Sequence, residues 1–212
     1  QLPRTKDCEA YVLFSLTHSN TLHVHNPINS YIVDSKRACL CAYAKRKLVF
    51  YVWNGTDVSS FTEYRRHDMS AEIPPDLRDG STVSLTWADR NVCLGIPDRG
   101  YVLVDVETGL VKRKVFDVRF PATTRVCRFA EEDGELEMMK DEDDEDEDEI
   151  LLARENRGYF MDTTEIMPSR VLGHCVEWSS PPTQILSVFP YIVSLTNKNQ
   201  LEVHNSITTK RC

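Results

Sequence analysis

The sequence predicts an all-β protein, specifically a β-propeller of WD40-like blades. Short apolar runs with a period of two end in Asn, Asp or Gly turns along most of the 212-residue chain, which is typical of strands joined by hairpins. The same strand–turn–strand unit recurs five times, and tandem units of this kind are typical of propellers. Helices are expected to be almost absent, because the clearest candidate, residues 138–149, is a block of like charges that repels itself.

The clearest unit lies in the middle of the chain. Apolar runs at residues 92–96 and 101–106 flank the sequence Pro97-Asp98-Arg99-Gly100. Because proline favours the second position of a tight turn and glycine the last, this stretch predicts a β-hairpin. Residues 107–109 then turn the chain again before a third apolar run at 111–118. The unit is therefore strand, tight turn, strand, turn, strand.

Related units lie on both sides of this one. Their earlier strands are expected at residues 11–16, 38–43, 92–96, 150–153 and 191–195, and the strands after the hairpin turn at 22–26, 50–54, 102–105, 159–162 and 201–205. The interval of 42 residues between Asp162 and His204 equals one blade. The interval of 28 residues between His25 and Trp53 is too short, so we expect residues to be missing near 28–36. We predict a single domain over residues 1–212 that is part of a larger propeller.

Acidic residues are concentrated in one segment. Residues 131–149 contain 14 of the 33 acids and one base, Lys140, so that outside this segment 24 Lys and Arg exceed 19 Asp and Glu. Such a segment has almost nothing to bury, and we expect a disordered acidic loop that is dispensable for folding. A loop that binds a basic partner is the alternative. The loop falls between residues 125–130 and 150–153, which we expect to be the first and second strands of one blade.

The remaining composition is that of a cytosolic globular protein. Apolar residues make up 41% of the chain, but no run of about 18 of them predicts a transmembrane helix. Residues 1–4 lack the apolar core of a signal peptide. We expect reduced, mostly buried thiols, because the seven cysteines are scattered without a C-x-x-C pair. They are Cys8, Cys39, Cys41, Cys93, Cys127, Cys175 and Cys212.

No motif in the sequence predicts catalysis. There is no nucleophile elbow, P-loop or dinucleotide-binding fingerprint, and the central set of histidines and carboxylates that a propeller hydrolase needs cannot be assembled. Asp105 and Asp162 lie at equivalent strand ends, where a carboxylate typically accepts hydrogen bonds from turn backbone. We therefore predict a protein that is not an enzyme. The tryptophans are expected to pack in the core rather than to form binding hot spots; they are Trp53, Trp87 and Trp178.

Two residue pairs have a spacing that metal sites use. His23 with His25, and Cys39 with Cys41, each point to one face of a strand. Neither pair has completing ligands nearby, and His204 occupies the position of His25 in another unit. Structural roles are therefore favoured, and no metal or cofactor is expected.

The hairpin turns between second and third strands carry a charge pattern. In a propeller these turns all lie on one face, and the acidic segment belongs to a loop of the opposite face. We predict a basic face that binds a partner; its residues are Lys45, Arg46, Lys47, Arg99, Arg157 and Lys198. Solubilising turn charges are the alternative interpretation.

Several strands, together with their flanks, resemble the citron homology (CNH) domain, in the version found in vacuolar-sorting tethering subunits. The resembling segments lie between about Ser35 and Asn205; they are residues 45–53, 84–87, 92–95, 101–105, 178–182, 189–193 and 201–204. The order of these segments and the run F-P-Y-I-V carry the resemblance, since no single motif is diagnostic.

The resemblance implies a propeller that mediates protein interactions in the HOPS or CORVET complexes. Its expected partners are a Rab-type small GTPase and other subunits of a tethering complex, with possible peripheral contact to anionic membrane and no nucleic acid. The expected location is cytoplasmic, peripheral on late endosome, lysosome or vacuole membranes, with a role in vesicle fusion, protein transport and autophagy. The alternative is a regulatory CNH domain of a Ste20-like kinase or a Rho exchange factor.

Overall fold

The computed structural model describes residues 28–34, 37–54, 61–73, 83–115, 118–126, 130–132, 135–137, 148–164, 167–170 and 174–212. Every regular element in these ranges is a β-strand, which confirms the predicted all-β class. No helix in them is long and apolar enough to cross a bilayer.

Four antiparallel sheets of three or four strands, together with one two-stranded hairpin, make up the described part of the chain. The first has the order β1-β2-β3-β4 (Ser30–Asp34, Cys39–Ala44, Lys47–Trp53 and Phe61–Asp68). The second is β5-β6-β7-β8 (Ser84–Ala88, Asn91–Ile96, Gly100–Asp105 and Val111–Val115). The third is β9-β12-β13-β14 (Thr123–Val126, Glu149–Arg154, Arg157–Asp162 and Cys175–Glu177), and the fourth is β15-β16-β17 (Pro182–Val188, Tyr191–Thr196 and Leu201–Asn205).

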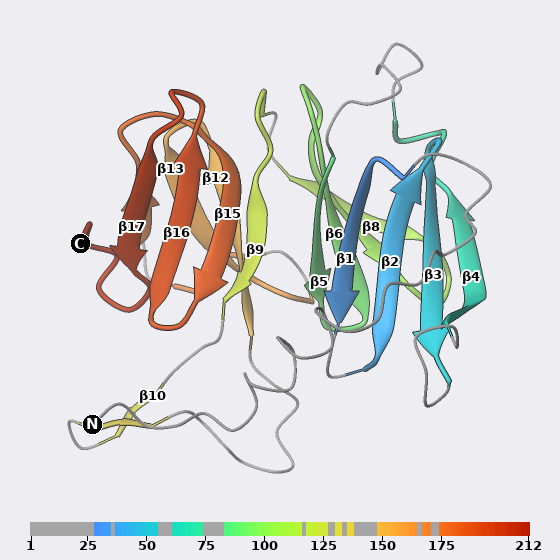
Figure 1. The fold of residues 1–212 in the computed structure, drawn as a ribbon, viewed down its shortest axis with the longest axis horizontal. Helices are drawn as coiled ribbons and strands as arrows, with labels where there is room; N and C mark the ends of the chain where they lie inside the picture. Colours follow the sequence, from blue (N-terminus) through green and yellow to red (C-terminus); the bar gives the residue numbers. More distant parts are fainter. Residues whose placement is uncertain are drawn as a thin grey trace, which may run out of the picture.

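The sheets are arranged as the blades of a propeller. The first strand of each sheet contacts the first strand of the next, in the order β1, β5, β9 and β15. These four strands therefore lie innermost, and the sheets fan outward from them, as Figure 1 shows. Within every sheet the strands follow chain order from the centre to the edge.

Four of the five predicted units correspond to these sheets. The unit at residues 11–26 lies outside the described residues. The segment near 28–36, where residues were expected to be missing, contains a complete first strand, because all five residues of β1 pair with β2. The predicted hairpin in the middle of the chain is confirmed: β6 pairs with β7 around Pro97-Asp98-Arg99. Asp98 there has a φ of 59°, the positive value that a type II turn requires at its third position.

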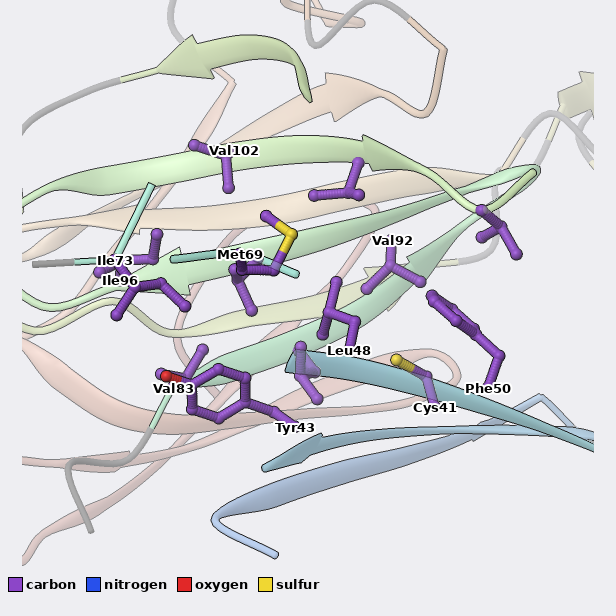
Figure 2. Close-up of a cluster of buried hydrophobic side chains, with 14 of the residues drawn as sticks. Cys41, Tyr43, Leu48, Phe50, Met69, Ile73, Val83, Val92, Ile96 and Val102 are labelled. Carbon is purple, nitrogen blue, oxygen red and sulfur yellow. The ribbon is translucent and has the colours of Figure 1, made fainter. Parts of the chain in front are cut away.

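Apolar side chains fill the spaces between neighbouring sheets. Between the first and second sheets, Phe50 packs against Trp87 with their ring centres 5.9 Å apart. Leu48, Cys41 and Met69 belong to the same cluster, part of which Figure 2 shows. Equivalent clusters form between the second and third sheets, around Tyr101, Leu103, Ile150 and Leu152, and between the third and fourth, around Phe160, Trp178 and Ile192. Since burying one such side chain stabilises the fold by roughly 1.5–3 kcal/mol, these contacts hold the blades together.

Two buried polar side chains also connect neighbouring sheets. The Tyr101 hydroxyl donates to the Ala153 carbonyl at 2.6 Å and accepts from the Ala122 amide at 3.0 Å. Burial raises the pKa of Tyr101, so the hydroxyl keeps its proton. The Trp178 indole N–H donates to the Ser194 hydroxyl at 2.8 Å, from the third sheet to the fourth.

The acidic segment differs at its ends from the expected disordered loop. Ala130–Glu132 (β10) and Glu135–Glu137 (β11) pair as a small hairpin. At the other end, Glu149 is the first residue of β12 and is buried, and Asp148 forms an ion pair with Arg125. The boundary of the loop is therefore corrected to exclude these two residues, because each has a cationic partner that a reading of charge density alone does not reveal. Residues 138–147 lie outside the described residues, and their disorder stays a prediction.

Of the cysteines, only some are as buried as expected. Cys41 and Cys93 are fully buried, and burial raises the pKa of the Cys93 thiol to about 12. Cys39 and Cys175 are half-buried, and Cys212 is exposed. These five are free thiols, while Cys8 and Cys127 lie outside the described residues.

Candidate interaction face

The hairpins that join the second and third strand of each sheet lie at one end of the propeller. They are the β2–β3, β6–β7, β12–β13 and β16–β17 turns, and Figure 1 shows them at the top of the view. We call this end the turn face. All six predicted basic residues lie in or directly beside these turns, one group on each sheet. They therefore form an arc around the centre of the propeller rather than a single cluster.

The β2–β3 turn places two cations in a conformation that non-glycine residues seldom adopt. Lys45 and Arg46 have φ values of 44° and 63° and form a two-residue hairpin between the paired residues Ala44 and Lys47. Such a hairpin usually contains Asn-Gly, because both central residues need positive φ. A left-handed residue that carries a side chain costs about 1–2 kcal/mol, so the turn keeps Lys and Arg at the expense of stability.

The bases differ in how far acidic neighbours compensate them. Arg157 pairs with Glu177 at 3.0 Å on the adjacent strand, and both side chains are exposed. The pKa of Asp68 is lowered, chiefly by hydrogen bonds from Ser70 and further by the charges of Lys47 and Arg46. Lys45, Arg99 and Lys198 have no ion-pair partner among the described residues. Arg46 and Lys47 have no ion-pair partner among the described residues either, so Arg157 is the one predicted cation that an acidic side chain pairs with there.

A hollow opens at the centre of the turn face. It has a volume of about 900 Å³ and is bounded by the β6–β7 turn, by the segment that leads into β9 and by the fourth sheet. Arg119 lines it, with its guanidinium 5.3 Å from the ring centre of Phe120. This hollow could not be predicted from the sequence, because its walls come from segments that are far apart in the chain. The sequence contains no signal for it, because the exposure of leucines such as Leu201 is visible only in the structure.

At the opposite end of the propeller, the aspartates at the strand ends accept hydrogen bonds from turn residues, as predicted. Asp105 accepts hydrogen bonds from the Thr108 amide at 2.8 Å and from its hydroxyl at 2.9 Å. These bonds, led by the one from the amide, hold the pKa of Asp105 at about 2. Asp162 accepts the same pair of bonds from Thr164, and Asn205 accepts from two amides in its own turn.

The other residues singled out in the sequence have structural surroundings where the structure describes them. Trp87 and Trp178 are buried between sheets, and Trp53 is half-buried. His204 is buried, with its Nε2 3.0 Å from the Glu177 carbonyl and its ring edge-on to Trp178. The pair His23 and His25 lies outside the described residues. Within those residues, no three His, Cys, Asp or Glu side chains gather as metal ligands would.

Comparison with known proteins now identifies the family. The family described as "CNH domain" matches residues 2–211. The chain belongs to the CNH domain family. This confirms the broader part of the resemblance found in the sequence. CNH domains and WD40-like propellers are typically non-catalytic interaction modules, and no enzyme-specific feature accompanies the match. No curated protein sequence matches the chain.

Solved structures similar to this CNH domain have distantly related sequences. The WD40 domain of Neurospora crassa Pan2 superimposes with a TM-score of 0.51 at 14% identity, covering 88% of this chain and 49% of the Pan2 chain. The dihydro-heme d1 dehydrogenase NirN, solved in complex with DHE, gives 0.50 at 9% identity, covering 88% and 37%. The chain thus spans about half of the Pan2 domain that it matches. At such low identities the likeness establishes the propeller fold alone.

Proposed function

We propose that this CNH domain is the interaction module of an endolysosomal or vacuolar membrane-tethering subunit, and that its turn face binds a Rab-type small GTPase. The family match supports an interaction module, and the resemblance of the strand segments to tethering subunits supports the finer assignment. In this proposal the domain works at the cytoplasmic surface of late endosomes, lysosomes or vacuoles and supports vesicle fusion. Other tethering subunits would be further partners.

The observation that carries the proposal is the set of cations on the turn face without acidic partners. Lys45, Arg99 and Lys198 come from three different sheets, and Lys45 sits in a turn whose backbone favours other residues. Cations spread along one face attract an acidic surface over a distance and make the association rate depend on salt. Such charges affect partner specificity and association rate more than affinity.

The experiment measures binding of the purified domain to a panel of Rab GTPases loaded with GTP or GDP. Wild-type domain is expected to bind at least one GTP-loaded Rab, with an association rate that falls as salt rises. The triple variant Lys45→Glu, Arg46→Glu, Arg99→Glu is expected to lose at least tenfold in association rate. Absence of binding by wild-type domain in low salt would remove the GTPase assignment.

Two lysines that flank one strand provide a matched control. Lys198 precedes β17 at the turn face, and Lys210 follows it at the opposite end; both are exposed. Lys198→Glu is expected to slow Rab association, whereas Lys210→Glu leaves it unchanged. Equal effects of the two would mean that net charge, and not the turn face, controls binding.

Anionic lipid is the competing ligand of the same cations. Each base near an anionic membrane surface contributes about 1 kcal/mol of attraction. Liposomes that contain phosphatidylserine are therefore tested with the same variants. Loss of liposome binding with unchanged Rab binding would assign the turn face to the membrane instead.

A further inference from the structure

One histidine lies buried between the third and fourth sheets. His204 of β17 is 1% exposed, and its Nε2 lies 3.0 Å from the backbone carbonyl of Glu177 on β14. Its ring stands edge-on to the Trp178 ring, with the ring centres 6.3 Å apart. Trp178 in turn donates a hydrogen bond to Ser194 of the fourth sheet. His204 therefore belongs to the contact that holds these two sheets together.

The bond to Glu177 determines which nitrogen of the imidazole carries the proton. A carbonyl oxygen only accepts hydrogen bonds, so Nε2 must be the donor. In the neutral ring Nδ1 is then an acceptor, and this atom of His204 is buried without a hydrogen-bond partner among the described residues. Protonation would place an N–H donor and a positive charge at a buried position where those residues provide no acceptor. The contact between the sheets therefore favours the neutral ring.

Two acids lie near His204, and both are engaged elsewhere. The Glu177 side chain is exposed and pairs with Arg157 at 3.0 Å. Glu202, two residues before His204 and on the same face of β17, is buried and accepts hydrogen bonds from the amide and the hydroxyl of Ser179. Neither carboxylate is hydrogen-bonded to Nδ1 of His204.

The other groups beside the ring do not favour a charge on it. Arg211 pairs with His204 across the edge of the fourth sheet and brings a positive charge to the same pocket. Cys175 and Thr209 also line this pocket, which has a volume of about 400 Å³ and gives water a route to the contact. Burial lowers the pKa of His204, because it outweighs the opposing effects of the bonded carbonyl and the nearby carboxylate.

We infer that His204 makes the contact between the third and fourth sheets sensitive to pH, so that mild acid opens it. In the open state the imidazole meets water and takes up a proton at Nδ1, whereas in the closed state it stays neutral. The contact is therefore complete above the ordinary histidine pKa of about 6.5 and weakens as the pH falls below that value. The open population rises by up to about tenfold for each pH unit below 6.5, as far as the pKa of the closed state. The inference does not depend on the GTPase assignment.

Hydrogen exchange of the full 212-residue chain, followed by mass spectrometry, measures this opening. Exchange is compared at about pH 7 and about pH 5.5 and corrected for the intrinsic pH dependence of amide exchange. Protection of the peptides that contain Trp178 and His204 is expected to fall about threefold or more in acid. Peptides of β6, in the middle of the second sheet, are the internal reference and should keep their protection.

His204→Gln is the decisive variant, because a glutamine amide can still donate to the Glu177 carbonyl but does not titrate. Its protection is expected to be independent of pH over the same range, even if its stability is lower than that of the wild type. His174, exposed just before β14, provides the matched control. His174→Gln is expected to keep the wild-type dependence on pH. A transition that persists in His204→Gln and disappears in Glu202→Gln would assign the sensor to Glu202 and overturn the inference.

A nuclear magnetic resonance titration of the histidine rings is the second test. The resonance that is absent from His204→Gln identifies the ring in the wild-type spectrum. In the folded chain this ring is expected to stay neutral at pH values where an ordinary histidine is already charged. Uptake of the proton at or above about pH 6.5 while the contact stays closed would overturn the inference. Protection around Trp178 that does not change with pH in the wild type would also overturn it.

Discussion

Replacing Arg170 by Leu should destabilise the propeller far more than the loss of a surface charge. The Arg170 guanidinium donates to both carboxylate oxygens of Glu149, at 2.9 and 2.6 Å to Oε2 and 3.2 Å to Oε1. It also donates to the Ser206 carbonyl at 2.7 Å, which joins the third sheet to the turn after β17. The guanidinium carbon lies 3.4 Å from the ring centre of Phe160. The Glu149 side chain is only 2% exposed.

The expected cost follows from that burial. Without Arg170, the Glu149 carboxylate keeps one bond, from the Ser169 hydroxyl at 2.6 Å, and an unpaired buried charge costs about 3–5 kcal/mol. Because a domain of this length shifts by roughly 2–4 °C per kcal/mol, the melting temperature should fall by about 10 °C. Replacing both residues by Leu should cost much less than the sum of the single changes, since no charge is then left unpaired.

Urea denaturation followed by circular dichroism measures these differences. The Glu63–Arg66 pair is the control, because its N–O distance is also 2.6 Å but both side chains are exposed. Arg66→Leu is expected to leave the denaturation midpoint nearly unchanged. If Arg170→Leu costs less than about 1 kcal/mol, or if the double change is additive, then the pair is not a buried connection between sheets and the argument from burial fails.

Four other changes have expected outcomes. Lys45→Asn with Arg46→Gly should stabilise the fold by about 1–2 kcal/mol in urea denaturation, since both residues suit positive φ, while Rab binding falls. Gly158→Ala should lower the melting temperature by the equivalent of about 1–3 kcal/mol, because a Cβ atom there would lie 2.5 Å from the Trp178 ring. Asp105 has a folded-state pKa of about 2, below its ordinary value, so its contribution to stability is complete above about pH 4 and lost as the pH falls towards 2. The stability difference between wild type and Asp105→Asn should therefore be constant above about pH 4 and disappear as the pH falls towards 2. Deleting residues 138–147 with a short Gly-Ser joint should leave the melting temperature unchanged, because so charged a segment has little to bury.

Local rules allowed the strands and turns to be predicted. The hairpin around Asp98 and the turn that Asp105 caps depend on residues within five positions of one another, so composition and period were sufficient. Boundaries were less accurate: the first strand of the third sheet begins at Thr123 rather than Arg125, and β-branched threonine suits a strand.

Features that depend on packing between distant segments could not be predicted in this way. In the sequence, Glu149 is the last residue of an acidic run. Its ion-pair partner Arg170 is 21 positions away, in a segment without a motif, so the pair could not be predicted. The central hollow requires the β6–β7 turn, Phe120 and Leu201 to meet, which only the closure of successive sheets around one axis brings about. The basic turns were predictable as a set because the repeat assigns them to one end, but their individual ion pairs were not.

The turn face is where this chain departs most from what folding alone favours. Single residues with positive φ occur at both ends of the sheets, Ala38 and Asp89 among those at the opposite end. Lys45 and Arg46 are the one consecutive pair of such residues within the described part of the chain, and both are long cations. The most exposed leucine of the described residues, Leu201, lies at the same end beside the hollow. Residues that lower stability tend to persist at functional sites. The strained cationic turn and the exposed leucine at the same end therefore favour an interaction role for this face over a role in solubility. Solubility would be served equally well by charges on an unstrained turn, and it would be harmed by an exposed leucine.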